Sequence, residues 1–226
     1  MITIIFYAGL AFAFAVGWNV IDILKDRAET VNLSEKQLLV GYSQERFFKR
    51  PIIINMAITA HLFVCGLSQC GKSKMVEYAI KDKNVILVNI FKEDFISIKS
   101  RRINGKDKIK EFLKNLISEP YYRDAPLYIV IDELLVLCMD KEIPGLIMDL
   151  LAIGRHYNIF VIGISQTGTK ETIKFKDLFN ARICFRQVED SAYKTVLGYT
   201  PDNRDLLPRQ FHLYSDQLAF GYTYDI

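Results

Sequence analysis

The pattern of apolar and polar residues divides the chain into an uncharged N-terminal run and a longer alternating region. After the charged stretch Lys25–Lys36, short apolar runs alternate with stretches whose apolar residues recur at helical spacing. The short runs predict strands, and their near-continuous apolar character is typical of strands buried on both faces of a parallel sheet. The expected strands are His61–Cys65, Asn84–Ile90, Leu127–Ile131, Asn158–Ser165 and Ala181–Arg186, with Gln217–Tyr224 as a last strand.

Helices are predicted to begin near Lys72, Asp107 and Ile143, each between two of the expected strands. In the helix near Asp107 the apolar residues recur every three or four positions, which builds a single apolar face. Pro144 is tolerated because it falls in the first turn of its helix. Strands that alternate with helices predict an α/β fold with a mostly parallel sheet and helices on both faces.

The uncharged run Met1–Ile21 is long enough to cross a membrane as one helix. At 1.5 Å per residue it spans about 30 Å, the thickness of a bilayer core. Trp18 lies near its end, where an interfacial aromatic residue is favoured, and Lys25 and Arg27 follow. A cleaved signal peptide is an alternative, although such peptides normally begin with basic residues, and a buried core helix is another.

We therefore predict three regions along the chain. Residues 1–24 form a single transmembrane anchor, residues 25–38 form a charged linker, and residues 39–226 form the main domain. Because basic residues that follow a membrane span stay on the cytoplasmic side, we expect the main domain to be cytoplasmic.

Composition narrows the function classes without selecting one. The chain has 226 residues, of which 50% are apolar and 24% charged, so it can bury a core and is not disordered. Its net charge of +3 is too small to indicate nucleic acid by itself. The four cysteines lack the C-x-x-C or Cys/His spacing of a zinc site.

The turn after His61–Cys65 carries the most specific motif. Residues 66–73 read G-x-x-x-x-G-K-S, directly after a strand and at the start of a helix, which is the context of a phosphate-binding P-loop. Backbone N–H groups and the helix N-terminus attract phosphate, Lys72 neutralises the β- and γ-phosphates, and the Ser73 hydroxyl binds Mg²⁺. The expected nucleotide-binding residues are Gly66, Leu67, Ser68, Gln69, Cys70, Gly71, Lys72 and Ser73.

A second acidic motif follows the strand Leu127–Ile131, which ends in Asp132 and Glu133. Asp132 is expected to hold the Mg²⁺ shell, directly or through water. Glu133 is then placed to orient or deprotonate an attacking water. The paired carboxylates favour ATP hydrolysis over phosphate transfer to a small acceptor.

Two further polar residues have open interpretations. Gln166 follows the strand Asn158–Ser165, so it is either a contact to the γ-phosphate or water, or a solvated turn residue. Arg155 follows the helix near Ile143, where it either complements the helix dipole or acts as an arginine finger on a neighbouring subunit.

With these motifs in place, the sequence from about Leu39 onward resembles the FtsK/HerA superfamily of ring-forming DNA-translocating ATPases. The similar segments are 39–41, 51–55, 61–66, 150–166 and 181–186. The resemblance implies a RecA-like P-loop fold that uses ATP and Mg²⁺. It also implies that Lys72, Ser73, Asp132, Glu133 and Gln166 act within one subunit and Arg155 across a subunit boundary.

The function predicted from this resemblance is a membrane-anchored motor that translocates or packages double-stranded DNA as a homo-oligomeric, hexameric ring. The size is similar to mobile-element, plasmid and viral members. Protein secretion is the alternative, since FtsK-like motors also drive export. A small-molecule kinase is disfavoured because the sequence shows no arginine-rich lid over an acceptor. A basic stretch suits DNA tracking or a solvated helix face equally. Its basic residues are Lys92, Lys99, Arg101, Arg102, Lys106, Lys108, Lys110 and Lys114.

Overall fold

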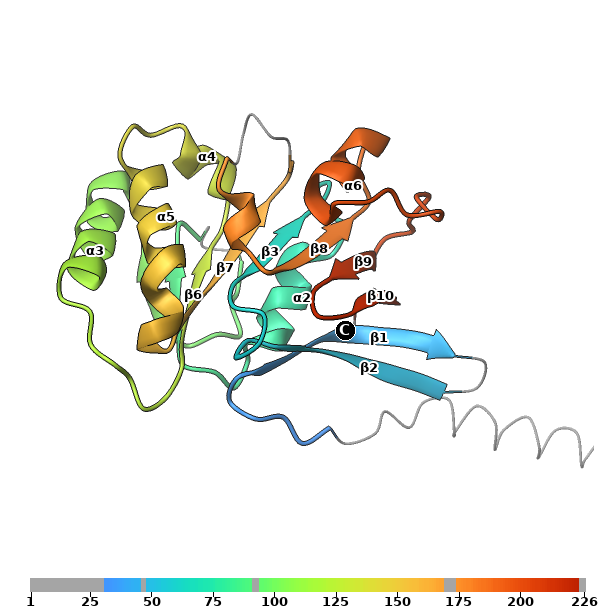
Figure 1. Ribbon diagram of the computed structural model, residues 1–226, viewed down its shortest axis with the longest axis horizontal. Coiled ribbons are helices and arrows are strands. Elements are labelled where there is room, and N and C mark those ends of the chain that lie inside the picture. Colours follow the sequence, from blue (N-terminus) through green and yellow to red (C-terminus); the bar gives the residue numbers. More distant parts are fainter. Residues whose placement is uncertain (1–30, 46–47, 91–93, 169–173, 224–226) are drawn as a thin grey trace, which may run out of the picture.

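The computed structural model describes residues 31–45, 48–90, 94–168 and 174–223. Within these residues ten strands form one sheet in the order β2-β1-β10-β9-β8-β3-β7-β6-β4-β5 (Figure 1). The strands are β1 (Gln37–Glu45), β2 (Phe48–Asn55), β3 (Leu62–Cys65), β4 (Val85–Val88), β5 (Arg101–Ile103), β6 (Leu127–Ile131), β7 (Ile159–Ser165), β8 (Ala181–Phe185), β9 (Gln210–Tyr214) and β10 (Leu218–Tyr222).

The sheet has a parallel part and an antiparallel part that meet at β8. From β8 to β5 all neighbouring strands are parallel, as expected from the alternation of strands and helices. From β8 to β2 all neighbours are antiparallel: β9–β10 and β1–β2 are hairpins, and β8–β9 and β10–β1 also pair antiparallel. The prediction of a mostly parallel sheet is therefore right for the centre and one edge. The predicted last strand Gln217–Tyr224 is present as β10, but its antiparallel pairing and the strands β1, β2 and β9 were not predicted.

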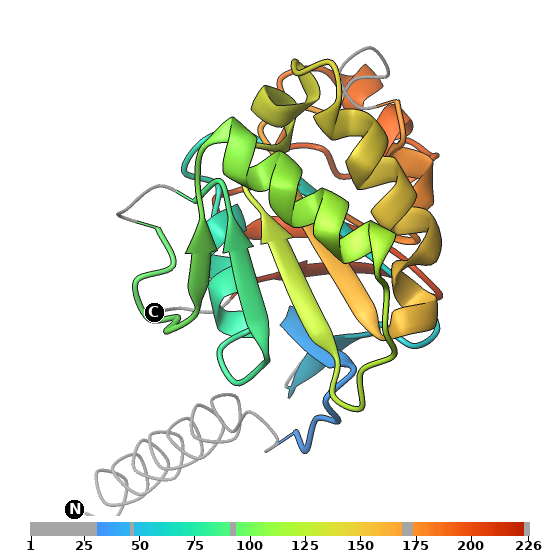
Figure 2. The ribbon, with the colours of Figure 1, turned by 90° about the vertical axis from the view of Figure 1, so that its left-hand side faces the viewer.

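Both faces of the sheet carry helices, as predicted, but unequally. The helices are α2 (Lys72–Ala79), α3 (Lys106–Ser118), α4 (Leu134–Cys138), α5 (Ile143–Ile153) and α6 (Asp190–Leu197), with short 3₁₀ turns η1 (Gly154–Tyr157) and η2 (Lys176–Leu178). Figure 2 shows α3 and α5 lying across one face of the parallel strands, with α2 behind the sheet.

The buried side chains of the central strands belong to two separate hydrophobic cores, one on each face of the sheet, because successive side chains of a strand point to opposite faces. On β3, Leu62 and Val64 join the core that contains α2, while Phe63 and Cys65 join the core beneath α3 and α5. All four side chains are fully buried. The strand that precedes the P-loop is thus held from both sides, and its carboxyl end has a fixed position.

The predicted membrane anchor lies outside the described residues, which begin at residue 31. Among the helices that the structure describes, none combines the length and apolarity needed to cross a bilayer.

Candidate active site

The P-loop connects the end of β3 to the start of α2, and its glycines are required by its shape. Gly66 has φ 151°, and a Cβ added there would lie 2.5 Å from the Cβ of Phe185. Gly71, at the N-cap of α2, has φ 107° in the left-handed region. Any side chain at Gly66 would clash with β8, so the first glycine of the motif is a packing requirement of this sheet.

Three neighbouring segments hold the P-loop through backbone hydrogen bonds. Gly66 N donates to Ser165 O at 3.3 Å, and Leu67 N donates to Arg186 O at 3.0 Å. Arg209 N donates to Cys70 O at 2.9 Å. The loop therefore takes its form from the ends of β7 and β8 and from the turn before β9.

Lys72 lies inside the loop. Its Nζ donates to Gly66 O at 2.7 Å and to Leu67 O at 2.8 Å, and the side chain is buried. This ammonium adds its charge to the positive end of α2, where backbone N–H groups face outward. The arrangement is an anion site suited to the phosphates of a nucleotide.

A cavity of about 630 Å³ opens beside the P-loop. Four of the eight predicted nucleotide-binding residues line it: Gln69, Gly71, Lys72 and Ser73. Five lining residues are not among the predicted nucleotide-binding residues: Lys74, Asp94, Pro208, Arg209 and Thr223. Lys74 directly follows the motif on α2, whereas the other four come from distant segments and carry no motif. Strand pairing and long-range hydrogen bonds place those four here, and neither can be read from a single sequence.

Asp132 and Glu133 lie at the end of β6, on the same edge of the sheet. Asp132 is buried, and Glu133 N donates to its Oδ1 at 2.9 Å. Burial raises the pKa of Asp132 to about 6, with the nearby charges of Glu133 and Asp94 acting in the same direction and Lys72 opposing them. A buried carboxyl beside other acids is stabilised as an anion when a cation binds there.

The donor set fits a magnesium ion held jointly by protein and nucleotide. The Ser73 hydroxyl and the Asp132 carboxylate are hard oxygen donors, the kind that Mg²⁺ prefers. In the part of the chain that the structure describes, no group of three or more His, Cys, Asp or Glu side chains is arranged around a metal position. Phosphate oxygens and water would therefore complete the coordination.

Glu133 and Gln166 are in contact. Gln166 Nε2 donates to Glu133 Oε1 at 2.9 Å, although 33 residues separate them. Glu133 has φ 47°, a left-handed conformation rarely adopted by non-glycine residues. The structure thus brings together the proposed base and the proposed sensor, which sequence analysis could assign only separately.

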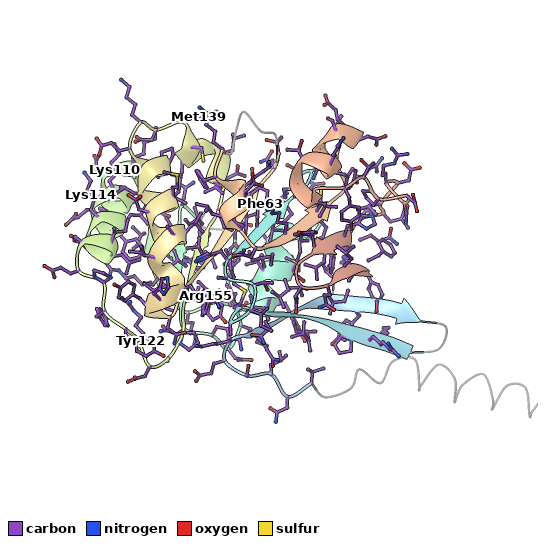
Figure 3. The ribbon with its side chains drawn as sticks, viewed as in Figure 1. Phe63, Lys110, Lys114, Tyr122, Met139 and Arg155 are labelled. Atoms are coloured by element: carbon purple, nitrogen blue, oxygen red, sulfur yellow. The ribbon has the colours of Figure 1, made fainter. Side chains whose placement is uncertain are left out.

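Arg155 lies at the amino-terminal ends of the parallel strands, opposite to the carboxyl ends where the P-loop lies. It belongs to η1, which precedes β7, whereas the P-loop follows the parallel strand β3. Figure 3 shows Arg155 below Phe63 of β3, whereas Met139, which follows α4, lies above Phe63. The exposed Arg155 side chain is therefore remote from the P-loop of its own chain.

Part of the basic stretch is engaged within the molecule. Lys110 Nζ lies 3.1 Å from Asp140 Oδ1, and Lys114 Nζ lies 3.1 Å from Glu142 Oε2, so both join α3 (Figure 3) to the segment that precedes α5. Arg102 hydrogen-bonds backbone carbonyls. Lys92 lies outside the described residues. The exposed members that remain are Lys99, Arg101, Lys106 and Lys108.

Comparison with known proteins identifies the fold. No family model and no curated protein sequence matches the chain. Among solved structures it is similar to the pCW3 conjugation coupling protein TcpA with ATPγS, at 18% identity and a TM-score of 0.70 over 89% of this chain and 69% of that one.

Two other solved structures show the same likeness. The type VII secretion ATPase EccC of Thermomonospora curvata has 16% identity and a TM-score of 0.66, over 90% of this chain and 30% of that one. The genome packaging NTPase B204 of Sulfolobus turreted icosahedral virus 2 has 14% identity and a TM-score of 0.55, over 74% of this chain and 98% of that one. This chain thus spans less than a third of the EccC structure.

The sheet and the P-loop together give the chain the fold of P-loop NTPases. Its fold is that of the FtsK/HerA-type ATPases, as the resemblance in the sequence implied.

We predict that Glu133→Gln retains ATP binding and loses hydrolysis by about 10²–10⁴-fold, because an amide cannot accept the proton of the attacking water. Single-turnover hydrolysis and equilibrium ATP binding measure the two effects separately. Glu119→Gln removes an exposed carboxylate elsewhere and serves as the control. Parent-like turnover by Glu133→Gln would show that another group activates the water.

Proposed function

We propose that the chain is an ATP-hydrolysing motor that moves or packages double-stranded DNA. The observation that carries the hydrolytic part is the hydrogen bond between Gln166 and Glu133, beside Asp132 and near the P-loop. A carboxylate that is oriented by an amide at the edge where phosphates bind is suited to activating water.

Each residue of the site has a defined task in this mechanism. Lys72 and the N–H groups of the P-loop bind the β- and γ-phosphates of ATP. Ser73 and Asp132 hold Mg²⁺, which when bound neutralises charge on the phosphate oxygens. Glu133 takes a proton from water while the water oxygen attacks the γ-phosphorus. The bond from that phosphorus to the bridging oxygen breaks, and ADP leaves with that oxygen. Gln166 occupies one oxygen of Glu133 and so orients the other toward the water.

The position of Arg155 supports assembly into a ring, if Arg155 is the arginine finger of this proposal. An arginine finger stabilises the charge that develops on the γ-phosphoryl oxygens. Arg155 is remote from its own P-loop, so it can act only on the nucleotide of a neighbouring copy. We therefore include a homo-oligomeric, hexameric ring in the proposed function.

DNA is the favoured cargo. Four exposed basic side chains near β5 and the start of α3 present positive charge: Lys99, Arg101, Lys106 and Lys108. Two of the similar structures are described as a conjugation coupling protein and a genome packaging NTPase. We further propose that residues 1–24 anchor the motor in a membrane and that the ATPase domain faces the cytoplasm.

Protein secretion is the second candidate function. The likeness to EccC, described as a type VII secretion ATPase, is nearly as close in TM-score as the likeness to TcpA. A shared fold does not select between these cargoes, since function depends on the site and surface rather than the fold.

For DNA, we predict stimulation of ATPase activity by duplexes of unrelated sequence, with salt-sensitive binding. Each phosphate contact contributes about −0.9 to the slope of log K against log salt, so Arg101→Ala with Lys108→Ala should flatten the slope by up to about 1.8. Lys114→Ala is the matched control because its ammonium pairs with Glu142. Absence of DNA stimulation would exclude the DNA motor and favour secretion.

For the ring, we predict that Arg155→Ala lowers turnover by about 10³–10⁵-fold with nearly unchanged ATP affinity. Mixing Arg155→Ala with Glu133→Gln should restore activity, because at mixed interfaces an intact site meets an intact arginine. A residue that only complements its helix dipole would lower stability modestly and give no complementation. Full DNA-stimulated turnover by Arg155→Ala would exclude the finger.

For the anchor, we predict that the full-length chain stays in membranes through an alkaline carbonate wash. A chain that starts near Asp26 lacks the uncharged run and should be released into the soluble fraction. Release of the full-length chain by carbonate alone would show that residues 1–24 do not span the bilayer.

A further inference from the structure

A turn at residues 94–98 links the nucleotide cavity to the edge of the sheet. Asp94, at its start, lines the cavity together with Lys72 and Ser73. Arg102, on the edge strand β5, donates from Nη2 to the carbonyl oxygens of Asp94 and Phe95, at 3.0 and 2.9 Å. One guanidinium therefore fixes the backbone that carries the Asp94 carboxylate.

The other end of the turn is fastened to the helix of the P-loop. Ser97 donates from N and Oγ to Glu77 Oε1 on α2, at 2.9 and 2.6 Å. Burial alone would raise the pKa of Glu77, but the hydrogen bonds from Ser97 and the charge of Lys74 hold it below its ordinary value. Between the two attachments the Phe95 side chain is buried. The turn therefore has little freedom to move relative to Lys72 and Ser73.

A carboxylate in this position is unexpected for a site that binds only phosphate. Of the described residues that line the cavity, Asp94 is the one acid, among the cations of Lys72, Lys74 and Arg209. A carboxylate repels nearby phosphate, so Asp94 alone weakens the binding of a free nucleotide. A divalent cation reverses this sign, because carboxylates bind the cation or the waters around it.

We propose that Arg102 is a positioning residue of the nucleotide site, which holds Asp94 toward the divalent cation of a bound Mg²⁺–nucleotide. Ser73 and Asp132 supply ligands from two other segments, and Asp94 completes the acidic side of the cation position. The inference rests on the proposed ATP-binding function. It also gives Arg102 a role different from the DNA contact considered for the basic stretch.

The test measures binding of ADP and ATPγS by the full-length chain, once with Mg²⁺ and once with EDTA. Asp94→Asn and Arg102→Ala should each bind about tenfold more weakly than the parent with Mg²⁺, the size typical of groups that orient metal ligands. In EDTA both should bind as tightly as the parent or more tightly. Arg102→Lys keeps a positive donor and should recover part of the loss.

The matched control is Arg123→Ala. Arg123 also donates to a backbone carbonyl, that of Tyr121 at 3.0 Å, but it lies away from the nucleotide cavity. Its variant should bind nucleotide like the parent in both conditions. This control separates the loss of a structural arginine from the loss of the arginine that holds Asp94.

Three results would overturn the proposal. Equal losses of affinity with Mg²⁺ and with EDTA would show a general distortion of the site. Parent-like binding by Asp94→Asn in both conditions would show that its carboxylate does not act through the cation. A flattened DNA salt slope with unchanged nucleotide binding would make Arg102 a DNA contact. If the parent binds no nucleotide in either condition, the proposed ATPase function itself fails.

Discussion

The parallel pairing of β3, β7 and β6 is the constraint on which the site depends. Cys65 pairs with Ser165, and Ile131 pairs with Gly163, so the three strands end at nearly the same level. The P-loop, Gln166 and Asp132 directly follow these strand ends and therefore lie close together. A slip of one residue in either pair would turn the following side chains to the other face of the sheet. The hydrogen bond between Gln166 and Glu133 depends on the register of β6 and β7, and the position of the P-loop beside Gln166 depends on the register of β3 and β7.

Two segments outside these strands complete the cavity, and each is fastened to the P-loop or its helix. The turn before β9 contributes Arg209, whose N–H binds Cys70 O, and Thr223 N in turn donates to Arg209 O. On the other side, Ser97 binds Glu77 on α2. The nucleotide site is therefore connected to the antiparallel part of the sheet through Arg209 and to the edge strand β5 through the hydrogen bond of Arg102 to Asp94 O.

The basic residues of the stretch 92–114 have two different roles, because some pair with groups of the same molecule and others remain exposed. The basic stretch reads as one patch in the sequence, but Lys110 and Lys114 pair with acids near α5 and Arg102 supports a turn. Such exposed or half-exposed pairs contribute little to stability, yet they reduce the charge available to a polyanion. What remains exposed is a smaller basic surface at the sheet edge and the start of α3, whose strength as a DNA contact depends on few side chains.

The sequence by itself determined the features that depend on neighbours along the chain. Buried apolar runs located the five central strands, and the spacing of Gly66, Gly71 and Lys72 located the P-loop, because local geometry imposes both patterns. The tertiary structure decided which distant residues meet there. Asp94, Arg209 and Thr223 carry no motif, and the edge and hairpin strands have weaker apolar patterns. Their places follow from strand pairing and long-range hydrogen bonds, which a single sequence does not display.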